Sequence, residues 1–128
     1  SNQQFIYSLR RMLDPIKEHV DNNFNPLPAE YTKEFAPVRQ KINDLMRMSC
    51  EQIETSRYEN YHEILAEADA CKDELSVLRK KHIDRIQHLS DNSLMQISLV
   101  YLNVLQESQE FLSVMRHQLR AAKKFMEK

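Results

Sequence analysis

Four carboxylates in one stretch of the chain are the side chains best suited to chemistry. Glu63 and Glu67 stand four residues apart, and so do Asp69 and Asp73. If this stretch is helical, the members of each pair project from successive turns of one face, where their oxygens can share a cation that relieves their repulsion. Oxygen ligands without a thiolate or imidazole favour a divalent or ferric cation such as Mg²⁺, Mn²⁺ or Fe³⁺ over zinc. Two interpretations stand: a metal site at Glu63, Glu67, Asp69 and Asp73, or a solvated acidic face.

Other residue types with catalytic chemistry are scattered. The five histidines include no His-x-x-x-His pair of the kind that holds a metal on one helix face. His82 falls on a stripe of apolar residues, where a hydrogen-bonded core histidine is the expected role. Ser49 and Ser108 also fall on apolar stripes, and neither has a base placed near it by sequence. We therefore expect no catalytic residue and no cofactor other than the divalent or ferric cation.

The two cysteines, Cys50 and Cys71, lie within apolar patterns on two different segments, and neither has a second thiol in ligand spacing. Two small, buried, reduced side chains are the expected state. This expectation favours an intracellular compartment.

The composition favours an all-helical chain. Hydrophobic residues make up 41% of it and charged residues 29%, and it contains no glycine and no tryptophan. Glycine-rich phosphate loops are therefore excluded, and sheets that need glycine turns are disfavoured. The 18 basic and 19 acidic residues give a net charge of −1, which provides no overall attraction to nucleic acid. No apolar run approaches the roughly 18 residues of a membrane span, so we expect a soluble chain.

Apolar residues recur every three or four positions along four segments, as on the buried face of a helix. Pro15 is expected to kink the first helix rather than end it, because the apolar phase continues across it. Pro37 is expected near the start of the second helix, where a missing N–H is tolerated. Asparagines and prolines at 22–28 mark the clearest connection. The predicted helices are 3–22, 29 or 32 to 56, 58–89 and 92–128.

The final segment has the longest apolar stripe, and the other helices must pack along it because a rod this long is unstable alone. Asp91 is expected to cap its start, and the cations near its end suit the helix dipole. These cations are Arg116, Arg120, Lys123, Lys124 and Lys128. The stripe consists of Leu94, Ile97, Tyr101, Val104, Ser108, Phe111, Met115, Leu119, Ala122 and Phe125. Five further residues give this stripe more apolar surface than three neighbouring helices need to cover it, which suggests an interface. These residues are Leu99, Val100, Leu102, Leu105 and Leu112.

The third segment keeps a seven-residue apolar period, which is typical of coiled-coil-like packing. Its stripe consists of Tyr61, Ile64, Ala68, Cys71, Leu75, Leu78, His82, Ile86 and Leu89. Short connections between long helices force neighbouring helices to run antiparallel. We therefore predict an all-α, antiparallel up-down bundle as a single domain over 1–128, with the helices at 58–89 and 92–128 as its spine.

A family resemblance rests on these last two segments. The third carries Glu67-Ala-Asp69-Ala-Cys-Lys-Asp73-Glu74, and the fourth closes with Met115-Arg-His-Gln-Leu-Arg-Ala-Ala-Lys-Lys-Phe125. Together with the order of the helices, this pattern resembles the PhoU-like helical domain. It is most similar to the version at the cytoplasmic C-terminus of bacterial sodium/phosphate (type II) cotransporter-family proteins. The resemblance covers essentially the whole chain.

The resemblance implies a metal motif in which an acidic residue is followed four positions on by aspartate. Asp69-x-x-x-Asp73 matches this motif in full, whereas Glu63-x-x-x-Glu67 ends in glutamate. Glu107 and Glu110 stand on the last helix where a second motif ending in aspartate would be expected.

The resemblance also implies a function. It indicates a non-catalytic regulatory domain involved in phosphate transport, on the cytoplasmic side of the inner membrane. The chain would then be a soluble fragment of a larger protein, and its partner would be the membrane-embedded transporter part of the same polypeptide. The alternative is a free-standing helical bundle that acts as an interaction module and forms a homodimer. Neither hypothesis involves nucleic acid.

Overall fold

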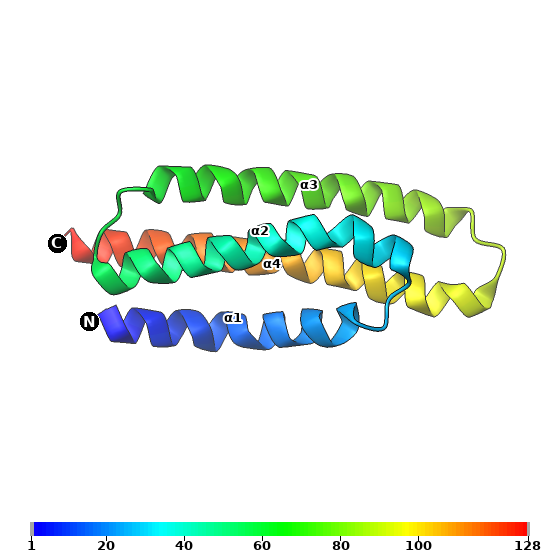
Figure 1. Ribbon diagram of the computed structural model, residues 1–128, viewed down its shortest axis with the longest axis horizontal. Helices are drawn as coiled ribbons and strands as arrows, with labels where there is room; N and C mark the ends of the chain where they lie inside the picture. Colours follow the sequence, from blue (N-terminus) through cyan, green and yellow to red (C-terminus); the bar gives the residue numbers. More distant parts are fainter. Residues whose placement is uncertain (1, 128) are drawn as a thin grey trace.

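The computed structural model describes residues 2–127, which fold into four long α-helices running alternately up and down (Figure 1). No strand occurs within these residues, so the prediction of an all-α up-down bundle is confirmed. Lys128, one of the cations predicted to interact favourably with the dipole of the last helix, lies outside the described residues. The elements are α1 Asn2–Phe24, α2 Ala29–Thr55, α3 Tyr61–Gln87, a 3₁₀ turn at Asn92–Leu94, and α4 Met95–Met126.

The connections follow the turn chemistry of the sequence, with shifted boundaries. Asp91 does act as a cap, because its side chain accepts a hydrogen bond from the Ser93 N–H at 2.9 Å. It caps the 3₁₀ turn, however, so α4 begins only at Met95. Ser56 ends α2 in the left-handed conformation, with φ of 55°.

Pro15 and Pro37 lie inside helices. Helix α1 continues across Pro15, as predicted. Helix α2 already begins at Ala29, so Pro37 lies in its interior rather than near its start. A proline there removes one N–H donor from the helix ladder. The buried side chains of Phe35 and Val38, on either side of Pro37, help to offset this loss through packing.

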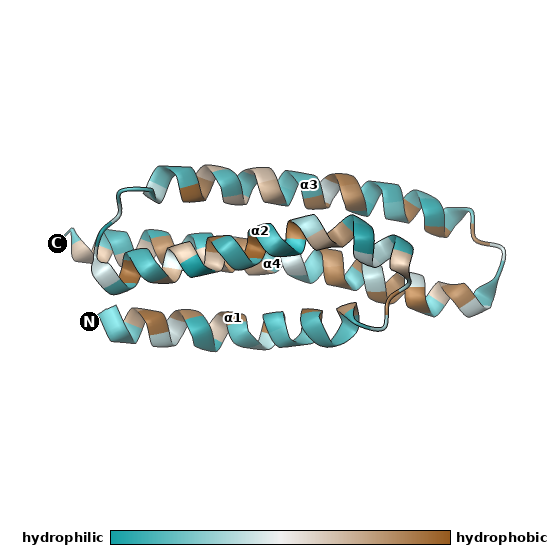
Figure 2. Cartoon of the chain, viewed as in Figure 1, coloured by the Kyte–Doolittle hydropathy of each residue, from teal (hydrophilic) through white to brown (hydrophobic). Residues whose placement is uncertain are grey.

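Helices α2 and α4 form the centre of the bundle, because each of them packs against all three other helices. Within the described residues, α1 and α3 lie diagonally opposite and make no contact. Helix α4 is the longest at 32 residues, but α2 and α3 have 27 residues each. The bundle is therefore organised around the α2–α4 pair rather than around the predicted spine of the third and fourth helices. In Figure 2 the apolar residues of α3 recur along its edge toward α2 and α4.

Most of the predicted stripes form the core. The second-helix positions expected to face inward are all buried, and so is the α4 stripe from Tyr101 to Ala122; these α2 positions are Val38, Ile42, Leu45, Ser49 and Ile53. The ends of the α4 stripe are exposed, which contradicts the prediction for Leu94, Ile97 and Phe125. At the start of α4 the physical reason is helix length: the α3–α4 connection extends beyond the α1–α2 connection, so α1 does not reach the first turns of α4 (Figure 1). Of the five residues that widen the stripe, Leu105 and Leu112 are buried and Leu99 is exposed.

Candidate functional site

The four predicted carboxylates all lie on α3 and are exposed, but they do not point to one place. Asp69 faces α4, where its Oδ2 lies 3.2 Å from Nη2 of Arg116. Glu67 instead lines the groove between α2 and α3, beside Lys41 and Glu74. In residues 2–127 no group of three or more His, Cys, Asp or Glu side chains could hold a metal ion. The four carboxylates therefore do not fit a single cation site.

The last-helix carboxylates do not complete such a site either. Glu107 points toward α1, where its Oε2 lies 2.5 Å from Nδ1 of His19. This contact ties α1 to α4 and leaves Glu107 away from the Asp69–Asp73 pair on α3. A cation bound by Asp69 and Asp73 alone remains a prediction.

Elemental analysis of protein purified without chelator tests that prediction. If the pair binds a divalent or ferric cation, the metal should be present in the unmodified protein. It should then be lost from an Asp69→Asn, Asp73→Asn double variant, since amide oxygens carry no charge to hold it. Metal that is absent from both proteins, or equally present in both, would remove the site.

A different set of side chains does converge, at the end of the bundle where α2 begins and α3 ends. We call it the polar cluster. It joins α2, α3 and α4, and none of its members was predicted to contact another. The polar cluster consists of Tyr31 and Glu34 of α2, His82 and Arg85 of α3, and Tyr101 of α4.

Glu34 is the acceptor at the centre of the polar cluster. Its Oε1 accepts hydrogen bonds from Nη2 of Arg85 at 2.7 Å and from the hydroxyl of Tyr101 at 2.8 Å. Its Oε2 accepts from Nζ of Lys81 at 2.9 Å. Arg85 also lies over the ring of Tyr31, 4.8 Å from its centroid, and that ring stacks on Tyr101. Such charge-assisted bonds are the strong class of protein hydrogen bond.

His82 is fully buried and uses both ring nitrogens. Nε2 lies 2.6 Å from the Ser98 carbonyl oxygen, which can only accept, so Nε2 carries the proton. Nδ1 then accepts from Nε of Arg85 at 3.2 Å. The neutral imidazole therefore satisfies both neighbours, and the prediction of a hydrogen-bonded core histidine is confirmed.

The electrostatics of the polar cluster follow from burial and partners. Burial alone would raise the pKa of Glu34, but hydrogen bonds from Arg85, Lys81 and Tyr101 outweigh it and lower the pKa. Burial and the Glu34 acceptor both raise the pKa of Tyr101. Burial lowers the pKa of His82, and this effect outweighs the bond to the Ser98 carbonyl, which raises it. The carboxylate is thus held charged, and the phenol and imidazole are held neutral.

This arrangement is better suited to holding helices than to chemistry. A general base needs a free nitrogen or oxygen within reach of a substrate proton. Both nitrogens of His82 are engaged, and the Tyr101 hydroxyl is committed to Glu34. The polar cluster therefore acts as a clamp between α2, α3 and α4.

The clamp should make stability depend on pH. The folded state lowers the pKa of His82, so below the ordinary histidine value of about 6.5 the unfolded chain binds more protons. Stability contributed by neutral His82 is then complete above about pH 6.5 and is lost as pH falls toward the folded pKa. We expect a slope of up to about 1.4 kcal/mol per pH unit in this window, measured by urea unfolding.

Substitution of the histidine tests this slope. His82→Gln should flatten the dependence just below pH 6.5, because it removes the titrating group. His62→Gln, at an exposed position at the other end of α3, is the control and should leave the slope in place. An unchanged slope in His82→Gln would show that another group is responsible.

The cysteines fit the role expected of them. Both are free, Cys71 is buried, and Cys50 is partly buried. Burial raises the pKa of the Cys71 thiol to about 11, so the thiol stays protonated and unreactive near neutral pH.

No protein-family model, curated protein or solved structure matches the chain. Within the described residues, no helix is both long and apolar enough to cross a membrane.

Proposed function

We propose that the chain is a non-catalytic regulatory domain of a sodium/phosphate cotransporter-related protein, acting on the cytoplasmic side of the inner membrane. Its partner is the membrane-embedded transporter part of the same polypeptide. The proposal is supported by the PhoU-like pattern in the third and fourth helical segments. The antiparallel helical bundle is compatible with it.

The observation that carries the non-catalytic part of the proposal is the polar cluster. The side chains with shifted pKa values at Glu34, His82 and Tyr101 are engaged in bonds between helices. A clamp across three helices links their positions, so a displacement of one helix is passed to the others. This is a mechanical role, which suits a domain that reports a signal to a transporter.

The upstream coding sequence and phosphate uptake together test this function. The coding sequence before residue 1 should encode several membrane spans. Removal of residues 1–128 from the full protein should leave phosphate uptake by cells intact but change its response to external phosphate. The absence of encoded spans, or an unchanged response, would contradict the proposal.

The alternative is a free-standing bundle that forms a homodimer. Val77 on α3 and Leu99 on α4 favour it, because both are large apolar residues exposed to solvent. Light scattering of the purified chain distinguishes the two. A stable dimer that becomes a monomer in a Val77→Ser, Leu99→Ser variant would support the free-standing, homodimeric bundle.

A further inference from the structure

One face of the bundle carries a strong local excess of positive charge. Residues 2–13 of α1 and residues 114–127, which include the end of α4, contain six basic residues and one acidic residue, whereas the whole chain has 18 basic and 19 acidic residues. These two segments lie side by side at the same end of the bundle (Figure 1). The Phe5 and Phe125 rings, with centroids 5.2 Å apart, fix this pairing. Opposite charge elsewhere balances the chain, so the excess belongs to these two segments.

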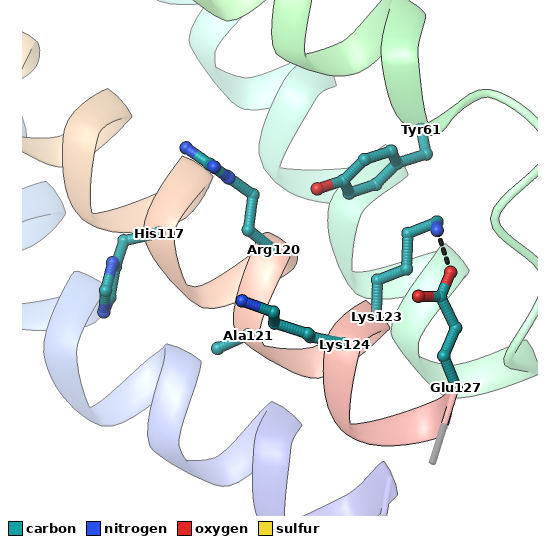
Figure 3. Close-up of a pocket in the computed structure, with 7 residues that line it drawn as sticks. All are labelled: Tyr61, His117, Arg120, Ala121, Lys123, Lys124 and Glu127. Carbon is teal, nitrogen blue, oxygen red and sulfur yellow. Dashed lines mark hydrogen bonds and ion pairs between the residues drawn. The ribbon is translucent and has the colours of Figure 1, made fainter.

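The basic side chains of this region that have no bonding partner lie on the outer surface of α4. His117, Arg120 and Lys124 follow the three-and-four spacing of one helix face and line an open hollow of about 460 Å³ (Figure 3). Among residues 2–127, neither Arg120 nor Lys124 has a hydrogen bond or ion pair. Two neighbouring cations are paired instead.

The paired cations show why the others are free. Arg116 turns toward α3 and contacts Asp69 at 3.2 Å. Lys123 is bonded to Glu127 and lies 5.0 Å from the centroid of the Tyr61 ring. The cations that face a neighbouring helix thus have partners, whereas those that face outward have none.

Exposed apolar side chains accompany these cations. Phe125 is 51% exposed and Met12 is 49% exposed. Met12 lies seven residues from both Phe5 and His19, which contact α4, so it belongs to the same side of α1. Arg11, which is also exposed, adjoins it. We call this set the terminal basic face: Arg11, Met12, His117, Arg120, Lys124 and Phe125.

We infer that the terminal basic face docks on an anionic lipid surface. Exposed aromatic and aliphatic side chains beside Lys and Arg are the combination that binds the boundary between headgroups and acyl chains. Arg11, Arg120 and Lys124 lie over the lipid phosphates, and Phe125 and Met12 enter the boundary. Anionic lipid headgroups present negative charge that is not fixed in position. They can therefore bind long Lys and Arg side chains that no neighbouring carboxylate holds in place. This inference goes beyond the regulatory function and does not depend on the transporter.

Vesicle binding by the purified 128-residue chain tests the inference. The chain should sediment with phosphatidylcholine vesicles that contain phosphatidylserine and not with phosphatidylcholine alone, and added salt should weaken the binding. Arg120→Glu combined with Lys124→Glu should weaken it more than about tenfold, since each basic residue near the surface contributes roughly fivefold. Phe125→Ser should weaken it without any change in charge.

A matched control separates this face from bulk charge. Lys33→Glu combined with Lys80→Glu changes the net charge equally, at exposed positions on α2 and α3, and should bind as the unmodified chain does. Circular dichroism checks that each variant is folded. Equal loss in the control, or no binding to anionic vesicles at low salt, would overturn the inference.

Self-association is the remaining outcome, and it would assign the face to a second copy instead. Light scattering detects it as a dimer that the Arg120→Glu, Lys124→Glu variant abolishes, without vesicle binding. All these measurements use the chain alone, so failure here leaves the proposed regulation of transport to its own test.

Discussion

Leu112→Ala should lower the free energy of unfolding by about 2 to 5 kcal/mol. Leu112 lies on helix α4 and is 0% exposed, so removal of its isobutyl group leaves a cavity in the core. Helix α4 contacts all three other helices, which limits how far the surroundings can collapse into that cavity. Urea unfolding followed by circular dichroism measures the loss.

Leu99→Ala is the matched control. It makes the same substitution on the same helix, but Leu99 is 49% exposed and faces solvent. We expect a change within about 0.5 kcal/mol. Similar losses at Leu99 and Leu112 would show that the helix is rotated relative to this description.

This contrast also shows how far the sequence could predict the fold. The apolar period identified all four helices and most of the buried positions, and the short connections predicted their antiparallel order. The period could not show which residues of a stripe are exposed to solvent, because their burial depends on how far the neighbouring helices extend. Leu94 and Ile97 keep the phase of the α4 stripe but lie beyond the α1–α2 connection.

The acidic residues illustrate a limit of spacing arguments. Residues four apart share a face, which places Glu63 with Glu67 and Asp69 with Asp73. Glu67 and Asp69 are two residues apart, however, so they are separated by roughly 200° around the helix. The structure accordingly directs Glu67 toward α2 and Asp69 toward α4. Helix geometry alone could have separated the two pairs.

The polar cluster could be predicted only in part. His82 falls on the α3 stripe, and burial of Tyr101 on the α4 stripe signals that its hydroxyl needs a partner. Glu34 and Arg85 lie off the stripes. Their meeting depends on the register between α2 and α3, which is set by connection length and packing rather than by any local pattern.

Glu34→Ala is expected to lower the free energy of unfolding by about 2 to 3 kcal/mol. The Tyr101 hydroxyl would lose its acceptor, and the Arg85 guanidinium would keep only Glu30 and His82 as acceptors while remaining largely covered. A largely covered guanidinium that loses its closest carboxylate partner is destabilised by more than the net value of that bond. Some solvent reaches Arg85, so the loss should stay below that of a fully buried pair.

Glu30→Ala provides the comparison, because Glu30 also contacts Arg85, at 3.2 Å from Nη1. The Glu30 side chain is 70% exposed and that of Glu34 is 10% exposed. An exposed ion pair contributes little, so we expect a loss well under about 1 kcal/mol. Equal losses at the two positions would show that the carboxylates act only through long-range charge.

The pH dependence of the Glu34 effect distinguishes a charged clamp from simple packing. Folding lowers the pKa of Glu34, so its contribution is complete above the ordinary glutamate value of about 4.3 and is lost as pH falls through the folded value. The difference in stability between the unmodified chain and Glu34→Gln, which keeps the shape, should therefore shrink as the solution is acidified below about pH 4.3. A difference that stays constant with pH would mean that Glu34 stabilises the bundle by packing alone, whereas a shrinking one assigns the effect to its charge on Arg85.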